Sequence, residues 1–134
     1  MASNELDKAI QNLIAMPNKK IEITKVWENA SPTSQFVAQS VSIGTVSPND
    51  FVMIKAKYAP TETRTITTLC KIGSRGEIVR LSSSWATTFS TREFSVTGTQ
   101  VQFEAGRVVV FNGTISTDNK VVVPTEIYVI KGVD

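Results

Sequence analysis

The acidic side chains are the first residues to consider for chemistry, because the sequence has 12 of them and no histidine. The missing histidine excludes His-based general acid–base chemistry, the Ser-His-Asp relay and imidazole metal ligation. Two carboxylates about 5–10 Å apart could still hydrolyse a glycosidic bond. Most of the acids stand in turns or next to basic residues, which is the ordinary pattern of a solvated face. We therefore predict no catalytic residues and no enzyme activity, with a carboxylate-based enzyme as the weaker hypothesis.

Loops that bind phosphate or metal are also missing from the sequence. Gly73-Ser74-Arg75-Gly76 precedes no helix, so it predicts a hairpin turn rather than a phosphate loop. Asp118-Asn119 offers too few oxygen ligands for calcium. We predict neither a metal nor a cofactor. The single cysteine, Cys70, excludes an intrachain disulfide and is interpreted as a small buried apolar group.

Aromatic side chains are the other candidates for ligand binding. Trp85 stands among serines and threonines, and Phe89 follows four residues later. An exposed tryptophan in a hydroxyl-rich loop suits a glycan or a protein partner, so Trp85 and Phe89 are the predicted ligand or partner residues. Other aromatics could belong to the same sugar-binding platform, with packing in the core or at its rim as the alternative. These are Trp27, Tyr58 and Tyr128.

The first 18 residues predict a helix that positions an apolar stripe. Ser3 or Asn4 can cap this helix, and Met16-Pro17-Asn18 ends it. A helix of about 13 residues is marginal alone in water, so it needs a surface to lie on. That surface could be the helix's own domain, copies of the helix or another protein. We predict that the stripe serves attachment or oligomerisation; its residues are Leu6, Ile10, Leu13 and Ile14.

From Lys20 onward the apolar residues alternate with polar ones, which is the period of a β-strand. Short strands separated by turns indicate an antiparallel sandwich or barrel, and no helix is long enough for a βαβ crossover. Asn112-Gly113 is the strongest turn signal, and Pro124 indicates an edge position or a bulge in the last strand. The sequence predicts an all-β, jelly-roll-like antiparallel sandwich over residues 19–134 behind a short N-terminal α-helix over residues 1–18. The expected strands are 20–27, 36–43, 51–58, 64–72, 77–81, 92–96, 100–103, 107–111 and 120–131.

Composition and charge limit the partners of this domain. The formal net charge is only +2 and the basic residues are scattered, which argues against nucleic-acid binding. No run approaches the roughly 20 apolar residues of a membrane span, so we predict no membrane insertion. The N-terminus lacks the basic start and apolar stretch of a signal peptide, and we expect synthesis in a cytoplasm.

Four segments carry a more specific pattern, in order along the chain: Val26–Ser34, Phe36–Ile43, Asp50–Ile54 and Pro124–Gly132. They resemble a β-module that recurs in tail-fibre and other minor structural proteins of tailed bacteriophages. The resemblance spans about residues 20–132 and is concentrated at the two ends. Residues 60–119 match mostly as a pattern of strands and loops. The chain departs from the family with Val129, where glycine is frequent, and with one short helix in place of a long stalk.

The resemblance implies a trimeric module on the outside of a phage particle, made in the bacterial cytoplasm and carried on the virion. Its partners would be other virion proteins of the capsid or tail and further copies of itself. The short lead-in favours a head-decoration or head-fibre protein attached through residues 1–18. The alternative is a tail-fibre or tail-tip module that binds a host-surface glycan. A carbohydrate-binding module built on Trp85 is a separate hypothesis.

Overall fold

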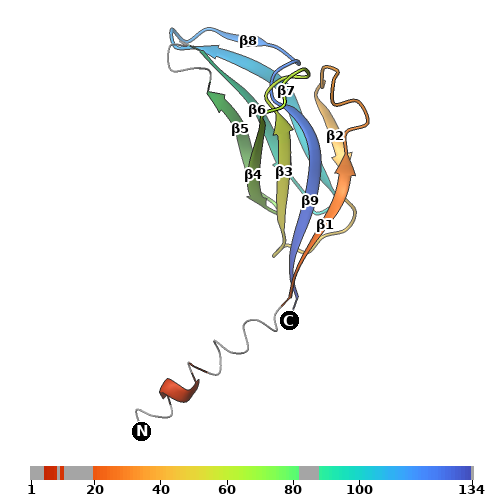
Figure 1. The fold of residues 1–134 in the computed structure, drawn as a ribbon, viewed down its shortest axis with the longest axis vertical. Helices are drawn as coiled ribbons and strands as arrows, with labels where there is room; N and C mark the ends of the chain where they lie inside the picture. The colour runs from red at the N-terminus through yellow and green to blue at the C-terminus, as the bar shows by residue number, and fades with distance from the viewer. Residues whose placement is uncertain (1–4, 9, 11–19, 82–87, 134) are drawn as a thin grey trace.

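The structure is a computed structural model that describes residues 5–8, 10, 20–81 and 88–133. Over these residues nine strands form two antiparallel sheets, stacked as a sandwich (Figure 1). The predicted all-β sandwich is confirmed. Glu5–Lys8 and Ile10 are helical. The strands are β1 Lys20–Glu28, β2 Gln39–Ser42, β3 Phe51–Lys57, β4 Thr65–Lys71, β5 Arg75–Leu81, β6 Thr88–Val96, β7 Gln100–Val110, β8 Ile115–Thr117 and β9 Val123–Val133.

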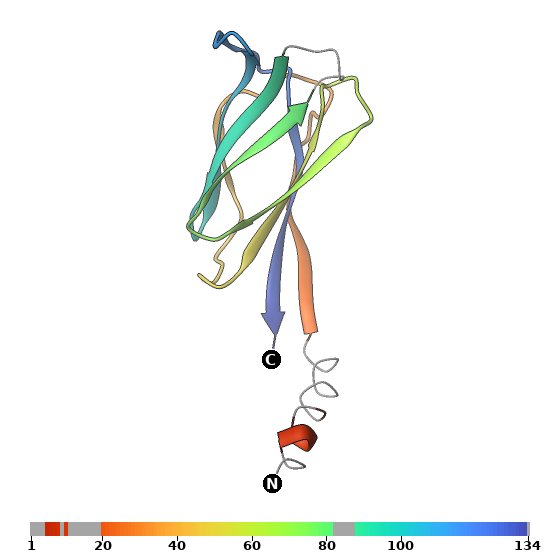
Figure 2. The same ribbon diagram turned by 90° about the vertical axis from the view of Figure 1, so that its left-hand side faces the viewer.

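The two sheets have different strand orders. Sheet A runs β1-β9-β3-β4, and sheet B runs β2-β7-β6-β5, with β8 also paired to β7. The chain crosses between the sheets after β1, β2, β4 and β8, whereas β5 to β8 follow one another within sheet B. Lys20 pairs with Val133, so β1 begins where β9 ends. Both strands extend beyond the rest of the sandwich toward this end, as Figure 2 shows.

The core lies between the sheets because alternate residues of each strand point inward. In β3 the side chains of Val52, Ile54 and Ala56 are fully buried, while their neighbours are more exposed. Burying a Val or Ile side chain stabilises a fold by roughly 1.5–3 kcal/mol. Cys70 is buried as predicted, and burial raises the pKa of its thiol. The core also takes in Phe36, whose backbone precedes β2 rather than joining a strand as predicted.

One predicted hairpin and one predicted turn are wrong. The turn at Gly73 does not close a hairpin within one sheet, because β4 belongs to sheet A and β5 to sheet B. Residues 104–106 do not separate two strands but lie inside the continuous β7. The strand β8 was not predicted, because its three residues are all exposed and show no alternation. The predicted turn at Asn112-Gly113, which precedes β8, is confirmed.

Pro124 is accommodated by a bulge, one of the two predicted solutions. Lys55 pairs with Glu126 and Ala56 pairs with Pro124, so Thr125 is an extra residue in β9. β9 as a whole lies between β1 and β3, but the β1 ladder ends at the Glu28–Glu126 pair, so Pro124 is paired with β3 alone. The proline thus combines a bulge with a position where one side of the strand has no ladder partner, and its missing N–H leaves no gap in a regular ladder.

A second bulge lies in β7 and is supported from the core by Arg92. Between the paired positions Arg92–Gly106 and Phe94–Phe103, β6 has one residue and β7 has two, Glu104 and Ala105. On its other side β7 pairs with β2 over residues 100–103 and with β8 over residues 107–109, which leaves the bulge without a strand partner there. The backbone groups of this stretch therefore need other partners.

The Arg92 side chain supplies one of those partners and also binds the loop before β9. It is completely buried, and its Nη1 donates to the Glu104 carbonyl at 2.7 Å. Its Nε donates to the Val122 carbonyl at 2.7 Å and its Nη2 to the Val121 carbonyl at 3.1 Å. Burial lowers the pKa of Arg92 to about 10, so the guanidinium keeps its charge at neutral pH. It also lies 5.2 Å from the Phe36 ring centroid, in a cation–π contact.

Candidate functional site

The predicted attachment stripe is only partly described. Leu6 and Ile10 are both helical, and their side chains are 62% and 45% exposed. They therefore do not pack into the core of the sandwich. Leu13 and Ile14 lie outside the described residues. The role of the stripe stays a prediction.

Phe89 belongs to an apolar row that crosses sheet B from edge to edge. Leu81 pairs with Phe89, Phe89 with Val109, and Val109 with Ile115, so all four side chains share the outer face of the sheet. Leu81 and Ile115 are 72% and 56% exposed. The Phe111 ring lies 6.1 Å from the Phe89 ring. We call these five residues the distal apolar row, because they lie at the end of the sandwich opposite the chain termini (Figure 1).

Trp85, the other predicted ligand residue, lies outside the described residues. The remaining aromatic candidates do not form one platform. Trp27 is half-buried at the core, with its ring 6.0 Å from that of Phe36. Tyr58 is covered by two guanidinium groups, those of Arg64 and Arg80, at 4.7 and 5.1 Å from its ring centroid. Tyr128 lies on the outer face of sheet A. Trp27 therefore fits the alternative prediction, in which these aromatic residues pack in the core or at its rim.

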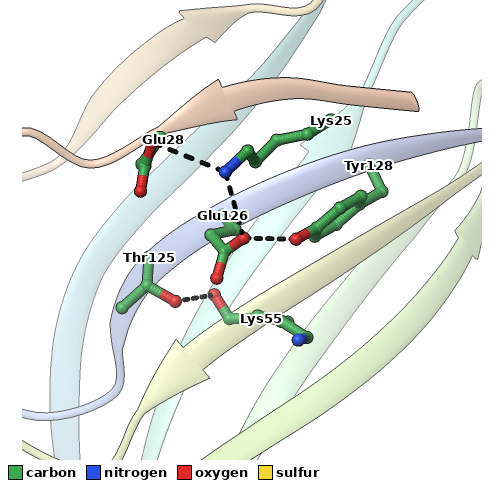
Figure 3. Close-up of polar contacts among 6 residues, drawn as sticks. All are labelled: Lys25, Glu28, Lys55, Thr125, Glu126 and Tyr128. Carbon is green, nitrogen blue, oxygen red and sulfur yellow. Dashed lines mark hydrogen bonds and ion pairs between the residues drawn. The ribbon is translucent and has the colours of Figure 1, made fainter. Parts of the chain in front are cut away.

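The outer face of sheet A carries a network of paired polar groups, shown in Figure 3. Lys25 Nζ lies 3.5 Å from a Glu28 oxygen and 3.8 Å from a Glu126 oxygen. The Tyr128 hydroxyl donates to the same Glu126 oxygen. Lys55 Nζ lies 5.8 Å from the Tyr128 ring centroid. These groups neutralise one another, so the network is a stabilising surface rather than an open binding site.

The hydrogen bond from Tyr128 gives a testable pH dependence. It raises the pKa of Tyr128 because the neutral phenol is the donor to Glu126. The folded protein therefore holds this proton to higher pH than the unfolded chain. The resulting stabilisation is present below about pH 10, the ordinary tyrosine pKa, and is lost as pH rises through the folded pKa. In a Tyr58→Phe background, we expect Glu126→Ala to lower the pKa of Tyr128, measured by phenolate absorbance.

The matched control for this titration is Glu28→Ala. Glu28 acts on Tyr128 only through its charge, and it is the weakest of the causes that raise the pKa. This variant keeps the hydrogen bond between Tyr128 and Glu126, so the pKa should fall much less. Equal shifts in the two variants would show that the hydrogen bond is not the main cause.

A hollow of about 670 Å³ lies on the outer face of sheet B, beside the distal apolar row. Its polar lining comes from three neighbouring strands, and we call it the polar basin. Arg107 Nη2 pairs there with Glu93. Sequence analysis missed this site because its acids are far apart along the chain and only the strand register brings them together. The polar side chains that line it are Arg75, Glu77, Glu93, Ser95, Gln102, Glu104 and Arg107.

A smaller hollow of about 370 Å³ lies beside the network on sheet A and includes Glu28, Glu62 and Glu126. Glu126 is engaged by Lys25 and Tyr128, and Glu62 by Arg64. The Arg64 guanidinium lowers the pKa of Glu62 through a hydrogen bond and its charge. A carboxylate held ionised in this way cannot serve as a general acid at neutral pH.

Within the described ranges, no group of three or more His, Cys, Asp or Glu side chains is placed to hold a metal ion. The described helical residues include no segment long and apolar enough to cross a membrane. Comparison of the chain with protein-family models, with curated proteins and with solved structures found no match in any of the three.

Proposed function

We propose that this chain is a surface-exposed, non-enzymatic β-module of a bacteriophage virion, attached at the end of the sandwich where β1 begins. The observation that supports this proposal is the presence of two exposed apolar surfaces at opposite ends of the molecule. The distal apolar row occupies one end. Leu6 and Ile10, which precede β1 along the chain, are also exposed. Such an arrangement suits a module that is held at one end and makes contacts at the other.

The end that carries the termini has a further apolar surface on sheet A. Ile23, Ile130 and Phe51 are paired across three strands, so their side chains share the outer face. Ile21, Ile23 and Leu69 are 69%, 59% and 61% exposed. Monomeric proteins rarely expose contiguous apolar patches larger than a few hundred Å². This patch supports coverage by other virion proteins or by copies of the chain, and three apolar helical stripes can bundle about one axis.

Within the virion, the primary role we propose is a head-decoration or head-fibre protein that forms a homotrimer anchored through residues 1–18. The chain would be made in the bacterial cytoplasm and incorporated into the particle there. The second candidate is a tail-fibre or tail-tip module. The exposure of Leu81, Phe111 and Ile115 around Phe89 in the distal apolar row favours it, because that end of the sandwich lies opposite the start of β1.

The attachment proposal predicts that the apolar stripe is required for assembly. In bacteria infected with a phage that encodes the chain, we expect the wild-type protein to copurify with phage particles in a density gradient. Leu6→Ser combined with Ile10→Ser should leave the protein folded but reduce its incorporation at least about tenfold, since each exposed apolar contact is worth more than 1 kcal/mol when buried. Quantitative mass spectrometry of the particles measures this.

The matched control is Glu5→Ser combined with Lys8→Ser, which changes two polar residues of the same segment. This variant should assemble normally. Normal incorporation of the Leu6 and Ile10 variant would refute attachment through this stripe. A chain that never enters particles would refute the virion role itself.

A further inference from the structure

The polar basin combines hydrogen-bond donors and acceptors in one hollow. Its volume of about 670 Å³ lies within the range of about 300–1,000 Å³ that is typical of small-molecule sites. Glu77 and Glu104 offer carboxylate acceptors, while Arg75 offers guanidinium donors. Neither glutamate has an ion-pair partner among the described residues. Because both signs of charge line the basin, a ligand with one strong charge would be repelled by part of the lining.

The basin includes an arrangement that costs stability. Glu77 lies directly opposite Glu93 across β5 and β6. Like charges in directly opposed positions destabilise a sheet. Arg107 pairs with Glu93, but Glu77 keeps no such partner among the described residues. Local arrangements that oppose stability are expected where a surface binds something.

The floor of the basin is held rigidly from the core side. Glu104 belongs to the bulge of β7, and a bulge redirects a side chain relative to a regular strand. The Glu104 carbonyl accepts a hydrogen bond from the buried Arg92. The carboxylate that lines the basin and the carbonyl that is held in the core thus belong to one residue. Side chains on strands whose backbone is fixed by hydrogen bonds from the core keep the fixed geometry that ligand binding needs.

We propose that the polar basin binds a carbohydrate, with Glu77, Glu104 and Arg75 as its hydrogen-bonding residues. Each sugar hydroxyl both donates and accepts, so adjacent hydroxyls can satisfy carboxylates and a guanidinium within one hollow. A peptide that adds as a strand would need a sheet edge, whereas the basin lies on the face of β5, β6 and β7. The site is independent of how the chain is attached to a particle.

The test is a screen of the full chain on an array of neutral and anionic bacterial oligosaccharides. The strongest neutral binder is then titrated into labelled protein and followed by amide NMR shifts. We expect saturable shifts at Arg75, Glu77 and Glu104. Glu77→Ala and Glu104→Ala should each weaken binding at least about tenfold, the effect of losing one charged hydrogen bond. The control is Glu22→Ala, an exposed glutamate on β1 in the other sheet, which should bind as the wild type does.

Three results of the screen and titration would overturn the proposal. The array could show that no neutral oligosaccharide binds or that only anionic oligosaccharides bind. The NMR shifts could cluster around Phe89 instead of the basin. Unchanged affinity in both Glu77→Ala and Glu104→Ala would also overturn it. If Glu104→Ala perturbs the bulge, the NMR spectrum without ligand shows this directly, and Glu77→Ala on β5 then decides the outcome.

Discussion

Replacing Arg92 by methionine should lower the free energy of unfolding by about 3 kcal/mol, because three buried backbone carbonyls lose their hydrogen-bond donor. Methionine fills much of the same space but donates no hydrogen bond. The carbonyls of Glu104, Val121 and Val122 would remain buried without their donor. Each unsatisfied buried carbonyl costs about 1–3 kcal/mol. Urea unfolding followed by tryptophan fluorescence measures the loss.

Backbone strain at Val122 offsets part of this expected loss, because it can be released once Arg92 is gone. Its φ of 49° is in the left-handed region, which a β-branched residue rarely adopts. Such a conformation costs about 1–3 kcal/mol and persists only where neighbouring contacts hold it. The hydrogen bond from Arg92 Nε is one of those contacts, and the bond from Val122 N to the Tyr58 carbonyl is another. Without Arg92 this segment can relax away from the core.

Two further variants define the contribution of Arg92. Arg92→Lys keeps the charge and some donors but not the planar fork, so it should recover only part of the stability. Arg75→Met removes an exposed arginine from β5 and should change stability by no more than about 0.5 kcal/mol. A loss below 1 kcal/mol in Arg92→Met would show that the loop carbonyls find other partners and that Arg92 does not hold the bulge.

The second large effect is expected for Gly106→Ala, at about 3 kcal/mol of destabilisation. An added Cβ would lie 2.2 Å from the Asp118 carbonyl oxygen and 2.9 Å from Arg92 Nη2. The Asp118 oxygen belongs to the backbone and cannot rotate away. The loop is also tied to this residue, because Asp118 N donates to the Gly106 carbonyl at 2.7 Å. The substitution therefore pushes the loop off β7.

Gly98→Ala is the matched control for Gly106→Ala. No atom lies within 4 Å of a Cβ added at Gly98, and its φ is outside the left-handed region. Alanine there should be neutral or stabilise by up to about 1 kcal/mol, because it restricts the unfolded chain. Combining Gly106→Ala with Arg92→Met should cost less than the sum of the two losses, since both disrupt one contact. Equal effects of the two glycine substitutions would show that the close approach at Gly106 is not limiting.

The period-two pattern was sufficient to predict the sandwich, since alternation in stretches such as Phe51–Lys57 follows directly from burial of one face. It did not predict which strands pair. Gly106 illustrates why: glycine in a strand pattern indicates either a turn or a close backbone contact, and only the position of Asp118 distinguishes them. The region of Arg92 departs from the period-two pattern, because three successive residues, Ser90, Thr91 and Arg92, are all buried.

The sequence was sufficient to predict part of one candidate site but not the other. Phe89 was identified by its local surroundings, and the structure places it in an exposed apolar row. The polar basin was not predicted, because Glu77, Glu93 and Glu104 look like separate solvated charges in the sequence. They become neighbours only through the register of β5, β6 and β7, including the extra residue at the bulge. Register is a long-range property that no short window contains.

The position of β9 has a consequence for biosynthesis. Of the nine strands, this one leaves the ribosome after the others, yet it occupies an inner position of sheet A, between β1 and β3. A nascent chain that stops before Val123 can form the β3–β4 and β5–β6 hairpins, but β1 then has no neighbour in its sheet. The sandwich can close only after translation has passed β9. Truncated products should therefore fail to fold and be removed by proteases, so that only full-length sandwiches are available for assembly.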